Sequence, residues 1–239
     1  MANNYSAVWR PGTGAQFCKA GLSLQELKDE DATLFGQGLR LVVLRRSGSN
    51  FDAVWRAAAT GAQFWKTGLD HDEFEKEDLK FFNQGLRLFA MHIEGDNYSG
   101  VWRPGTGAQF WRTGLSFKEF KKKDSEFFAQ GLRLRTMMKG YDGDYDEFMG
   151  VWRSGTGAQF WWTEKGSSFD QFKIEDKKHF DDGLRLVAFP PYALNAVWRT
   201  GTGEQRVKFA VSLDKFKEAD SDFLKQGLRL VDFWVGSSL

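Results

Sequence analysis

Short segments rich in aromatic and β-branched residues alternate along the chain with longer, charged segments that carry regularly spaced apolar residues. In the charged segment 115–131, phenylalanines recur at near-helical spacing. They are Phe117, Phe120, Phe127 and Phe128. Ser116 suits the N-cap of such a helix, and Gly131 suits the left-handed position that ends it. The pattern therefore predicts a helix over this segment.

The apolar segments on either side of this helix predict strands. YSAVWR is a short run of aromatic and β-branched residues, which favours extended backbone. PGTG follows as a turn, because glycine adopts positive φ without steric cost. AQFWRTGL is then a second strand, and LRL after the helix begins a third. Each unit thus contains strand, turn, strand, helix and strand, and its core is expected to combine helix phenylalanines with strand leucines such as Leu132 and Leu134.

This unit occurs five times, at intervals of 46 to 50 residues. Three markers recur: a tryptophan in the first strand, an aspartate in the helix and a glycine that opens GLRL. They are Trp9, Trp55, Trp102, Trp152 and Trp198; Asp31, Asp78, Asp124, Asp176 and Asp220; and Gly38, Gly85, Gly131, Gly183 and Gly227. Residues 1–239 therefore form one repeat domain with units 5–50, 51–97, 98–147, 148–193 and 194–239.

The chain begins with the first strand of a unit and ends with the last strand of one. Inside the chain these two strands follow each other across short loops, so each such pair is expected to form a hairpin. Pairing of the last strand, 228–235, with the first would remove the exposed sheet edges. The sequence thus predicts an α+β fold, mainly antiparallel β, that is curved or closed into a ring or barrel with pseudo-fivefold symmetry.

The motif VWRPGTGAQFWRTGLS, followed by QGLRLR, resembles the bacterial tandem repeat domain. Similar repeats form the non-catalytic N-terminal domain of fungal polyglycine hydrolases. The resemblance covers Tyr5 to Val235 and implies antiparallel strands that curve as a half-barrel around helices. It brings no catalytic residues, because the activity of those hydrolases belongs to a separate domain.

Charge and composition exclude several classes of partner. Lys plus Arg is 33 and Asp plus Glu is 32, so the chain lacks the basic excess that nucleic acid requires. No apolar run is long enough for membrane insertion, and the first residues lack the features of a signal peptide. With a single cysteine, no internal disulfide forms. We expect a protein that is cytoplasmic, or secreted without a recognisable signal peptide.

Three candidates for catalytic or metal chemistry are better explained as structure. Ser212-Leu213-Asp214-Lys215 matches SxxK and Lys66-Thr67-Gly68 matches KTG, but Ser212 occupies a helix N-cap position and no SDN element follows. Cys18 stands where other units have tryptophan, and no histidine recurs to activate it. Asp142, Asp144 and Asp146 begin like a calcium loop without completing it. The expectation is no enzyme, no cofactor and no metal.

Two sets of arginines recur with the repeat. The arginine of GLRL is expected to form an ion pair with the helix aspartate and so to lock helix to strand. This set is Arg40, Arg87, Arg133, Arg185 and Arg229. The arginine after each first-strand tryptophan lies beside a turn, where functional residues concentrate, and is a candidate ligand-binding residue. That set is Arg10, Arg56, Arg103, Arg153 and Arg199.

The second strand supplies the remaining candidates. Alternation places Gln109 and Trp111 on one face and Phe110, which suits the core, on the other. A flat ring beside an amide suits sugars, whose CH faces stack on rings and whose hydroxyls bond to planar polar groups. The candidate residues are Gln16, Gln63, Gln109 and Gln159, with Trp65, Trp111 and Trp161.

These features predict a multivalent, lectin-like carbohydrate-binding protein with shallow sites near the PGTGAQ turns and glycans as partners. Packing in the interior is the alternative role for the tryptophans and glutamines. A protein-interaction or structural accessory module without glycan binding is the alternative function.

Overall fold

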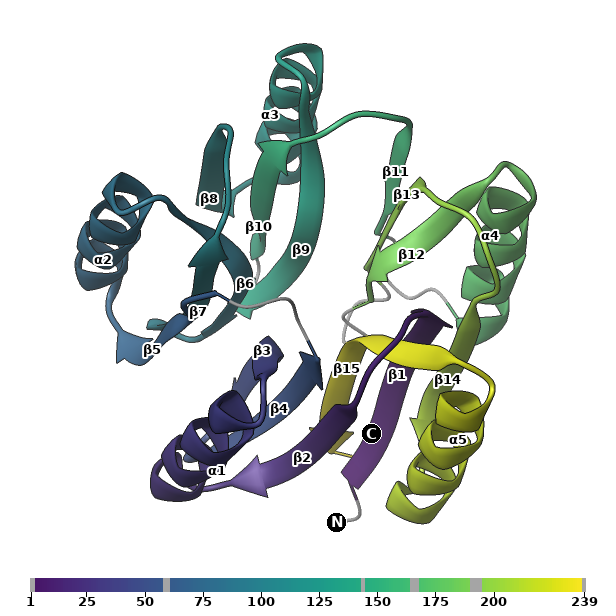
Figure 1. The fold of residues 1–239 in the computed structure, drawn as a ribbon. Coiled ribbons are helices and arrows are strands. Elements are labelled where there is room, and N and C mark those ends of the chain that lie inside the picture. Colours follow the sequence, from purple (N-terminus) through teal and green to yellow (C-terminus); the bar gives the residue numbers. More distant parts are fainter. Residues whose placement is uncertain (1–2, 58–60, 143–144, 164–167, 190–194, 238–239) are drawn as a thin grey trace.

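The structure, a computed structural model, describes residues 3–57, 61–142, 145–163, 168–189 and 195–237. Within these residues the chain forms five three-stranded antiparallel sheets, each accompanied by one 13-residue helix. Figure 1 shows the sheets placed around a common centre, with the helices at the periphery. The mixed, mainly antiparallel β architecture agrees with the predicted fold class. The five sheets are separately hydrogen-bonded, so in the described residues they do not form one continuous barrel.

All five sheets are built in the same way. One edge strand precedes the helix and the other edge strand follows it. In four sheets the central strand comes next in the chain, and in the fifth it is the first strand of the chain. In spatial order the sheets are β2 (Gln16–Leu22), β4 (Asn50–Ala57) and β3 (Leu39–Ser47); β5 (Phe64–Leu69), β7 (Asn97–Pro104) and β6 (Leu86–Glu94); β8 (Gln109–Leu115), β10 (Tyr145–Ser154) and β9 (Leu132–Asp142); β11 (Gln159–Trp162), β13 (Ala196–Thr200) and β12 (Leu184–Ala188); and β14 (Arg206–Val211), β1 (Asn3–Pro11) and β15 (Leu228–Ser237). The helices are α1 (Leu24–Gly36), α2 (His71–Asn83), α3 (Phe117–Ala129), α4 (Phe169–Asp181) and α5 (Leu213–Lys225).

The central strand of each sheet comes from the next unit of the repeat. Strands β3 and β4 form a hairpin with Ser47 opposite Asn50, and β6 and β7 form another with Glu94 opposite Asn97. In the fifth sheet the first strand of the chain, β1, takes the central place between β14 and β15. The predicted pairing of the first strand with the last is therefore confirmed.

The helices begin and end as their sequences predict. The hydroxyl of Ser116 accepts a hydrogen bond from Glu119 N–H, and the Glu119 side chain accepts one from the backbone of Ser116. Gly131 follows the C-cap residue with φ of 80°, the left-handed conformation that glycine adopts without strain. Ser212 is likewise the N-cap of α5. Its place in an SxxK motif is thus explained by helix capping.

Each sheet and its helix enclose one core cluster. The first-strand tryptophans are completely buried. In α3, Phe120 and Phe127 face this core beside Leu132 and Leu134. Contrary to the predicted stripe, Phe117 and Phe128 are 47% and 40% exposed. The helix lies on the outer side of its sheet, so only one side of it is covered.

The second-strand phenylalanines are on the core face but are not fully buried. Phe64 lies opposite Trp102 in the sheet, and its ring is stacked 5.0 Å from that of Phe81 on α2. Its strand is an edge strand, however, and the Phe64 ring is 43% exposed. Phe17 and Phe160 are 44% and 36% exposed. These residues face the core as predicted, but they are only partly buried, because an edge strand has a neighbouring strand on one side only.

Candidate functional site

The helix aspartate binds side chains from two neighbouring sheets. Asp78 on α2 accepts hydrogen bonds from Trp102 Nε1 at 2.7 Å, Gln109 Nε2 at 2.9 Å and Trp111 Nε1 at 3.0 Å. Trp102 belongs to the same sheet as α2, whereas Gln109 and Trp111 belong to the next one. We call such a cluster a seam. A single carboxylate thus holds two adjacent sheets together through three N–H donors.

The glutamine of the seam is satisfied at both ends of its amide. While Gln109 Nε2 donates to Asp78, Gln109 Oε1 accepts a hydrogen bond from Leu88 N at 2.5 Å. Leu88 lies on β6, the inner edge strand of the preceding sheet. The Gln109 side chain therefore closes an otherwise open strand edge as well as the seam.

Five seams of this kind occur. The aspartate, tryptophan and glutamine of each are Asp31, Trp55 and Gln63; Asp78, Trp102 and Gln109; Asp124, Trp152 and Gln159; Asp176, Trp198 and Gln205; and Asp220, Trp9 and Gln16. Trp65, Trp111 and Trp161 add a third donor to the first three. In the last two seams Val207 and Cys18 stand at that position and supply no indole N–H.

The fifth seam connects the two ends of the chain. Asp220 on α5 accepts from Trp9 Nε1 at 2.7 Å and from Gln16 Nε2 at 2.9 Å. Gln16 Oε1 in turn accepts from Leu230 N at 2.6 Å. Gln16 begins β2 of the first sheet, so the last sheet is attached to the first by the same bonds that join consecutive sheets.

Burial makes these carboxylates dependent on their donors. Desolvation raises the pKa of Asp78, and the hydrogen bonds from Trp102, Trp111 and Gln109 oppose this rise. The pKa values of Asp176 and Asp220 are raised for the same reason. Because burial disfavours the charged form, the donors are needed to keep a carboxylate at this depth.

The tryptophans and glutamines predicted to contact glycans lie within the seams. Gln109 and Trp111 do share one face of β8, as alternation predicted, but this face packs against the neighbouring module. The Trp65, Trp111 and Trp161 N–H groups, and the amides of Gln16, Gln63, Gln109 and Gln159, are all engaged within seams. Their polar atoms already have partners, and the alternative role in interior packing accounts for them.

The predicted ion pair between the GLRL arginine and the helix aspartate is not what the structure shows. Arg87 donates instead to the carbonyls of Phe82 and Leu86 and, through Nε, to Gly107 O at 2.7 Å. Its guanidinium lies 3.7 Å from the centre of the Phe82 ring. Phe82 is in the last turn of α2, where the helix dipole favours a cation. The aspartate is unavailable because its oxygens accept from tryptophan and glutamine.

Each arginine after a first-strand tryptophan is paired across its sheet with a GLRL arginine. Arg56 and Arg40 are directly opposite each other on paired strands, as are Arg10 and Arg229. The same pairing joins Arg103 to Arg87, Arg153 to Arg133 and Arg199 to Arg185. Like charges in this position are unfavourable. Burial, followed by a neighbouring arginine, lowers the pKa of all five candidate arginines.

A glycine in the turn makes room for four of these five guanidinium groups. A Cβ added at Gly105 would lie 2.7 Å from Arg153 Nη2 and 3.0 Å from Arg87 Cγ. Gly12, Gly155 and Gly201 are crowded by arginines in the same way. In the PGTG turn, the first glycine, Gly105, is thus explained by the close packing of arginine. The second, Gly107, is explained by its positive φ in the turn.

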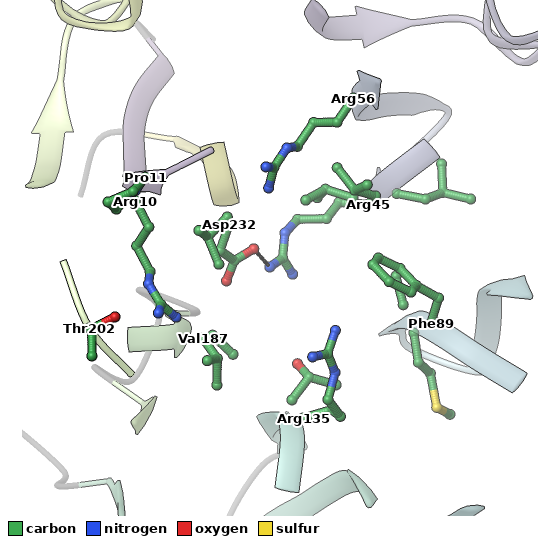
Figure 2. A pocket seen from close by; sticks show the side chains of 17 residues that line it. Arg10, Pro11, Arg45, Arg56, Phe89, Arg135, Val187, Thr202 and Asp232 are labelled. Atoms are coloured by element: carbon green, nitrogen blue, oxygen red, sulfur yellow. Dashed lines mark hydrogen bonds and ion pairs between the residues drawn. The ribbon is translucent and has the colours of Figure 1, made fainter. Parts of the chain in front are cut away.

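A cavity of about 330 Å³ lies at the centre, between the five sheets (Figure 2). Every sheet contributes to its wall, mainly from the inner strands β3, β6, β9, β12 and β15. Of the predicted site residues, Arg10 and Arg56 line it. Arg45, Arg135 and Asp232 also line it and were not among the predicted site residues. Comparison of the units could have found them, because the other units hold different residues at these positions.

One ion pair crosses this cavity. Arg45 Nη2 lies 2.5 Å from Asp232 Oδ1, and Arg45 Nε donates to Phe233 O at 2.7 Å. The other oxygen of Asp232 accepts from Phe189 N at 2.7 Å. Both side chains are less than a tenth exposed. Asp232 is therefore committed to Arg45 and to backbone donors, and it does not neutralise the remaining arginines of the cavity.

The structure does not support the candidate metal site or the candidate thiol nucleophile. In the described part of the chain no three histidine, cysteine or acidic side chains are close enough to hold a metal. Cys18 is half-buried, and burial, then Asp220 and Asp52, raise the pKa of its thiol, which opposes a nucleophilic role. The string Asp142, Asp144 and Asp146 lies outside the residues whose side chains are described.

Together, the folds and contacts define a protein of five similar strand-and-helix modules joined by seams around a central cavity. No protein family, no curated protein and no solved structure matches the chain. None of the helices in the described segments combines the length and apolar character needed to cross a membrane.

Proposed function

We propose that the protein is a non-catalytic, multivalent glycan-binding protein whose contact surfaces are the exposed second-strand phenylalanines. The observation that carries this proposal is the recurrence of a partly exposed ring at the start of the second strand in four of the five units. Phe17, Phe64 and Phe160 are 44%, 43% and 36% exposed, and Phe110 is half-buried. A ring supported from below by a helix residue, as Phe64 is by Phe81, is a rigid platform for the apolar face of a sugar.

The five modules are proposed to form a closed ring with pseudo-fivefold symmetry. The fifth seam and the pairing of β1 with β15 support closure, because they repeat between the chain ends the contacts made inside the chain. Such a ring would present its platforms at regular intervals around one circumference. Weak single sites would then gain avidity on a surface that displays many copies of a glycan.

The proposal differs from the sequence-based expectation in the residues involved. Since the seam tryptophans and glutamines are engaged internally, hydroxyl groups of a sugar would be bound by the backbone of the neighbouring turn. The fifth unit carries Arg206 where the others carry phenylalanine, so four sites are expected. Membership of the bacterial tandem repeat domain family remains part of this proposal.

The test is glycan-array binding followed by isothermal titration of the best glycan. The test variant replaces Phe17, Phe64, Phe110 and Phe160 with leucine, which keeps apolar volume in the sheet margin but removes the flat ring. We expect binding to be lost while the thermal transition is retained. A matched control replaces Leu79 and Ile174, which are 60% and 68% exposed, with alanine and is expected to bind normally.

Binding that is unchanged in the leucine variant, or absent for every glycan on the array, would contradict the proposal. The alternative is a protein-interaction or structural accessory module, for which exposed rings are equally suitable. Specific, saturable binding of a purified protein partner that is lost in the same leucine variant, without glycan binding, would support that alternative.

A further inference from the structure

Besides the paired Arg45 and Asp232, the wall of the central cavity contains one further residue that breaks the repeat. The position directly after LRL points to the centre in each unit and is apolar in four of them, as Val42, Phe89, Val187 and Val231. In the third unit this position is Arg135. Four units fold with an apolar residue at this site, so the fold itself does not require an arginine there.

The cationic groups of the cavity exceed the acidic groups that could neutralise them. Among the described residues, Arg10 and Arg135 form no hydrogen bond or ion pair, and Arg10 Nε is buried without a partner. Arg56 has a single long bond, 3.3 Å from Nη1 to Leu230 O. Asp232 is already paired with Arg45. Three guanidinium groups in the wall of one cavity thus have no counter-charge among the described residues.

This arrangement is costly in the absence of a ligand. A partly buried cation without a hydrogen bond or counter-charge loses hydration, and close arginines repel one another. For Arg135 the Phe89 ring, whose centre is 5.4 Å from the guanidinium carbon, replaces only part of that hydration. The electrostatics reflect both effects: burial, then Arg153 and Arg199, lower the pKa of Arg135 to about 10. In the view of Figure 2, the guanidinium groups of Arg10, Arg56 and Arg135 come from different sheets and lie around the Arg45–Asp232 pair.

We propose that the central cavity binds one small polyanion, a molecule with two or more phosphate or carboxylate groups, through Arg10, Arg56 and Arg135. Guanidinium groups bind the planar or tetrahedral oxygens of such groups with two parallel hydrogen bonds. The apolar wall, with Val187 and Phe89, reduces competition from water. A cavity of about 330 Å³ is large enough for a compact molecule.

This site is independent of the proposed glycan platforms. The platforms are on edge strands beside the peripheral helices, whereas the cavity is lined mainly by the inner strands. Loss of glycan binding in the phenylalanine variant therefore leaves the anion site intact, and either proposal can fail without the other.

Isothermal titration of the full chain with sodium tripolyphosphate and with citrate tests the proposal. We expect one site per chain for at least one of the two, with inorganic phosphate binding more weakly and with affinity falling as salt increases. Tighter binding of tripolyphosphate would indicate a phosphorylated ligand, and tighter binding of citrate a polycarboxylate.

The decisive variant is Arg135→Val, which installs the residue that three other units carry at this position. It is expected to weaken binding at least about tenfold. It is also expected to raise the melting temperature of the unliganded protein, because an unpaired cation is removed. Arg112→Ala, which removes an exposed arginine outside the cavity, is the control of equal charge and is expected to change neither quantity.

Three results would overturn the proposal: no binding of either polyanion at low salt, equal binding by the Arg135→Val variant, or a stoichiometry of several ions per chain. If Arg135→Val proves less stable than the parent, Arg135 has a structural role. Arg10→Gln then decides, and unchanged tripolyphosphate affinity in that variant would also contradict the site.

Discussion

Replacing Asp78 with alanine is expected to lower the free energy of unfolding by about 3–5 kcal/mol. The change leaves the indole N–H groups of Trp102 and Trp111 and the amide of Gln109 without their acceptor. Buried donors that lose both water and a partner carry the full desolvation penalty. Because the seam also joins two sheets, the loss should reduce the cooperativity of unfolding. Urea unfolding followed by tryptophan fluorescence measures both quantities.

The matched control is Glu75→Ala on the same helix. Glu75 is exposed, and its removal is expected to change stability by less than about 0.5 kcal/mol. Asp78→Asn should be almost as damaging as alanine, since an amide has one acceptor oxygen and adds two donors. A loss of under about 1 kcal/mol for Asp78→Ala would show that the seam is not a principal source of stability.

Removing residues 1–11 is expected to abolish cooperative folding of the isolated chain. Strand β1 is the central strand of the fifth sheet and contributes buried Val8 and Trp9. Truncating one large buried aromatic residue already costs about 3–5 kcal/mol, against a total stability of about 5–15 kcal/mol. Far-ultraviolet circular dichroism and thermal unfolding measure the outcome.

A circular permutant separates loss of the strand from loss of its position. Asn3 is opposite Ser237, just as Asn50 is opposite Ser47 in the β3–β4 hairpin. A chain that starts at Gly12 and carries residues 3–11 after Ser237, joined by a two-residue Asn-Gly turn, is expected to fold with near-parental stability. A truncated chain that unfolds cooperatively like the parent would contradict the role assigned to β1.

The parts of the fold that depend on local chemistry could be predicted from the sequence. Caps such as Ser116 and Gly131 act within one turn of a helix, so the residue types near the helix ends are sufficient to predict them. Hairpins such as β6–β7 follow from two apolar runs across a short turn. The pairing of the first strand with the last could be inferred as well, because the internal repeat shows what each end lacks.

The candidate site was harder to predict because it depends on contacts between modules. Alternation correctly placed Gln109 and Trp111 on one face, but nothing within a single unit shows that the preceding helix covers this face. For the same reason, the sequence led to the prediction of an ion pair between Asp78 and Arg87, which does not form. Arg135 could have been found by comparing units for positions that break the pattern. Its convergence with Arg10 and Arg56 required the arrangement of five sheets around one centre.

The central claim, that equivalent seams join all five modules and the last to the first, is tested most directly by hydrogen exchange of indole N–H groups. In nitrogen-15 NMR spectra, the indole protons of Trp9, Trp55, Trp102, Trp152 and Trp198 should show similar, strong protection, since each is donated to a helix aspartate. Trp9 is decisive, because its acceptor Asp220 is 211 residues away. Rapid exchange at Trp9, with slow exchange at the other four, would show that the last seam is open.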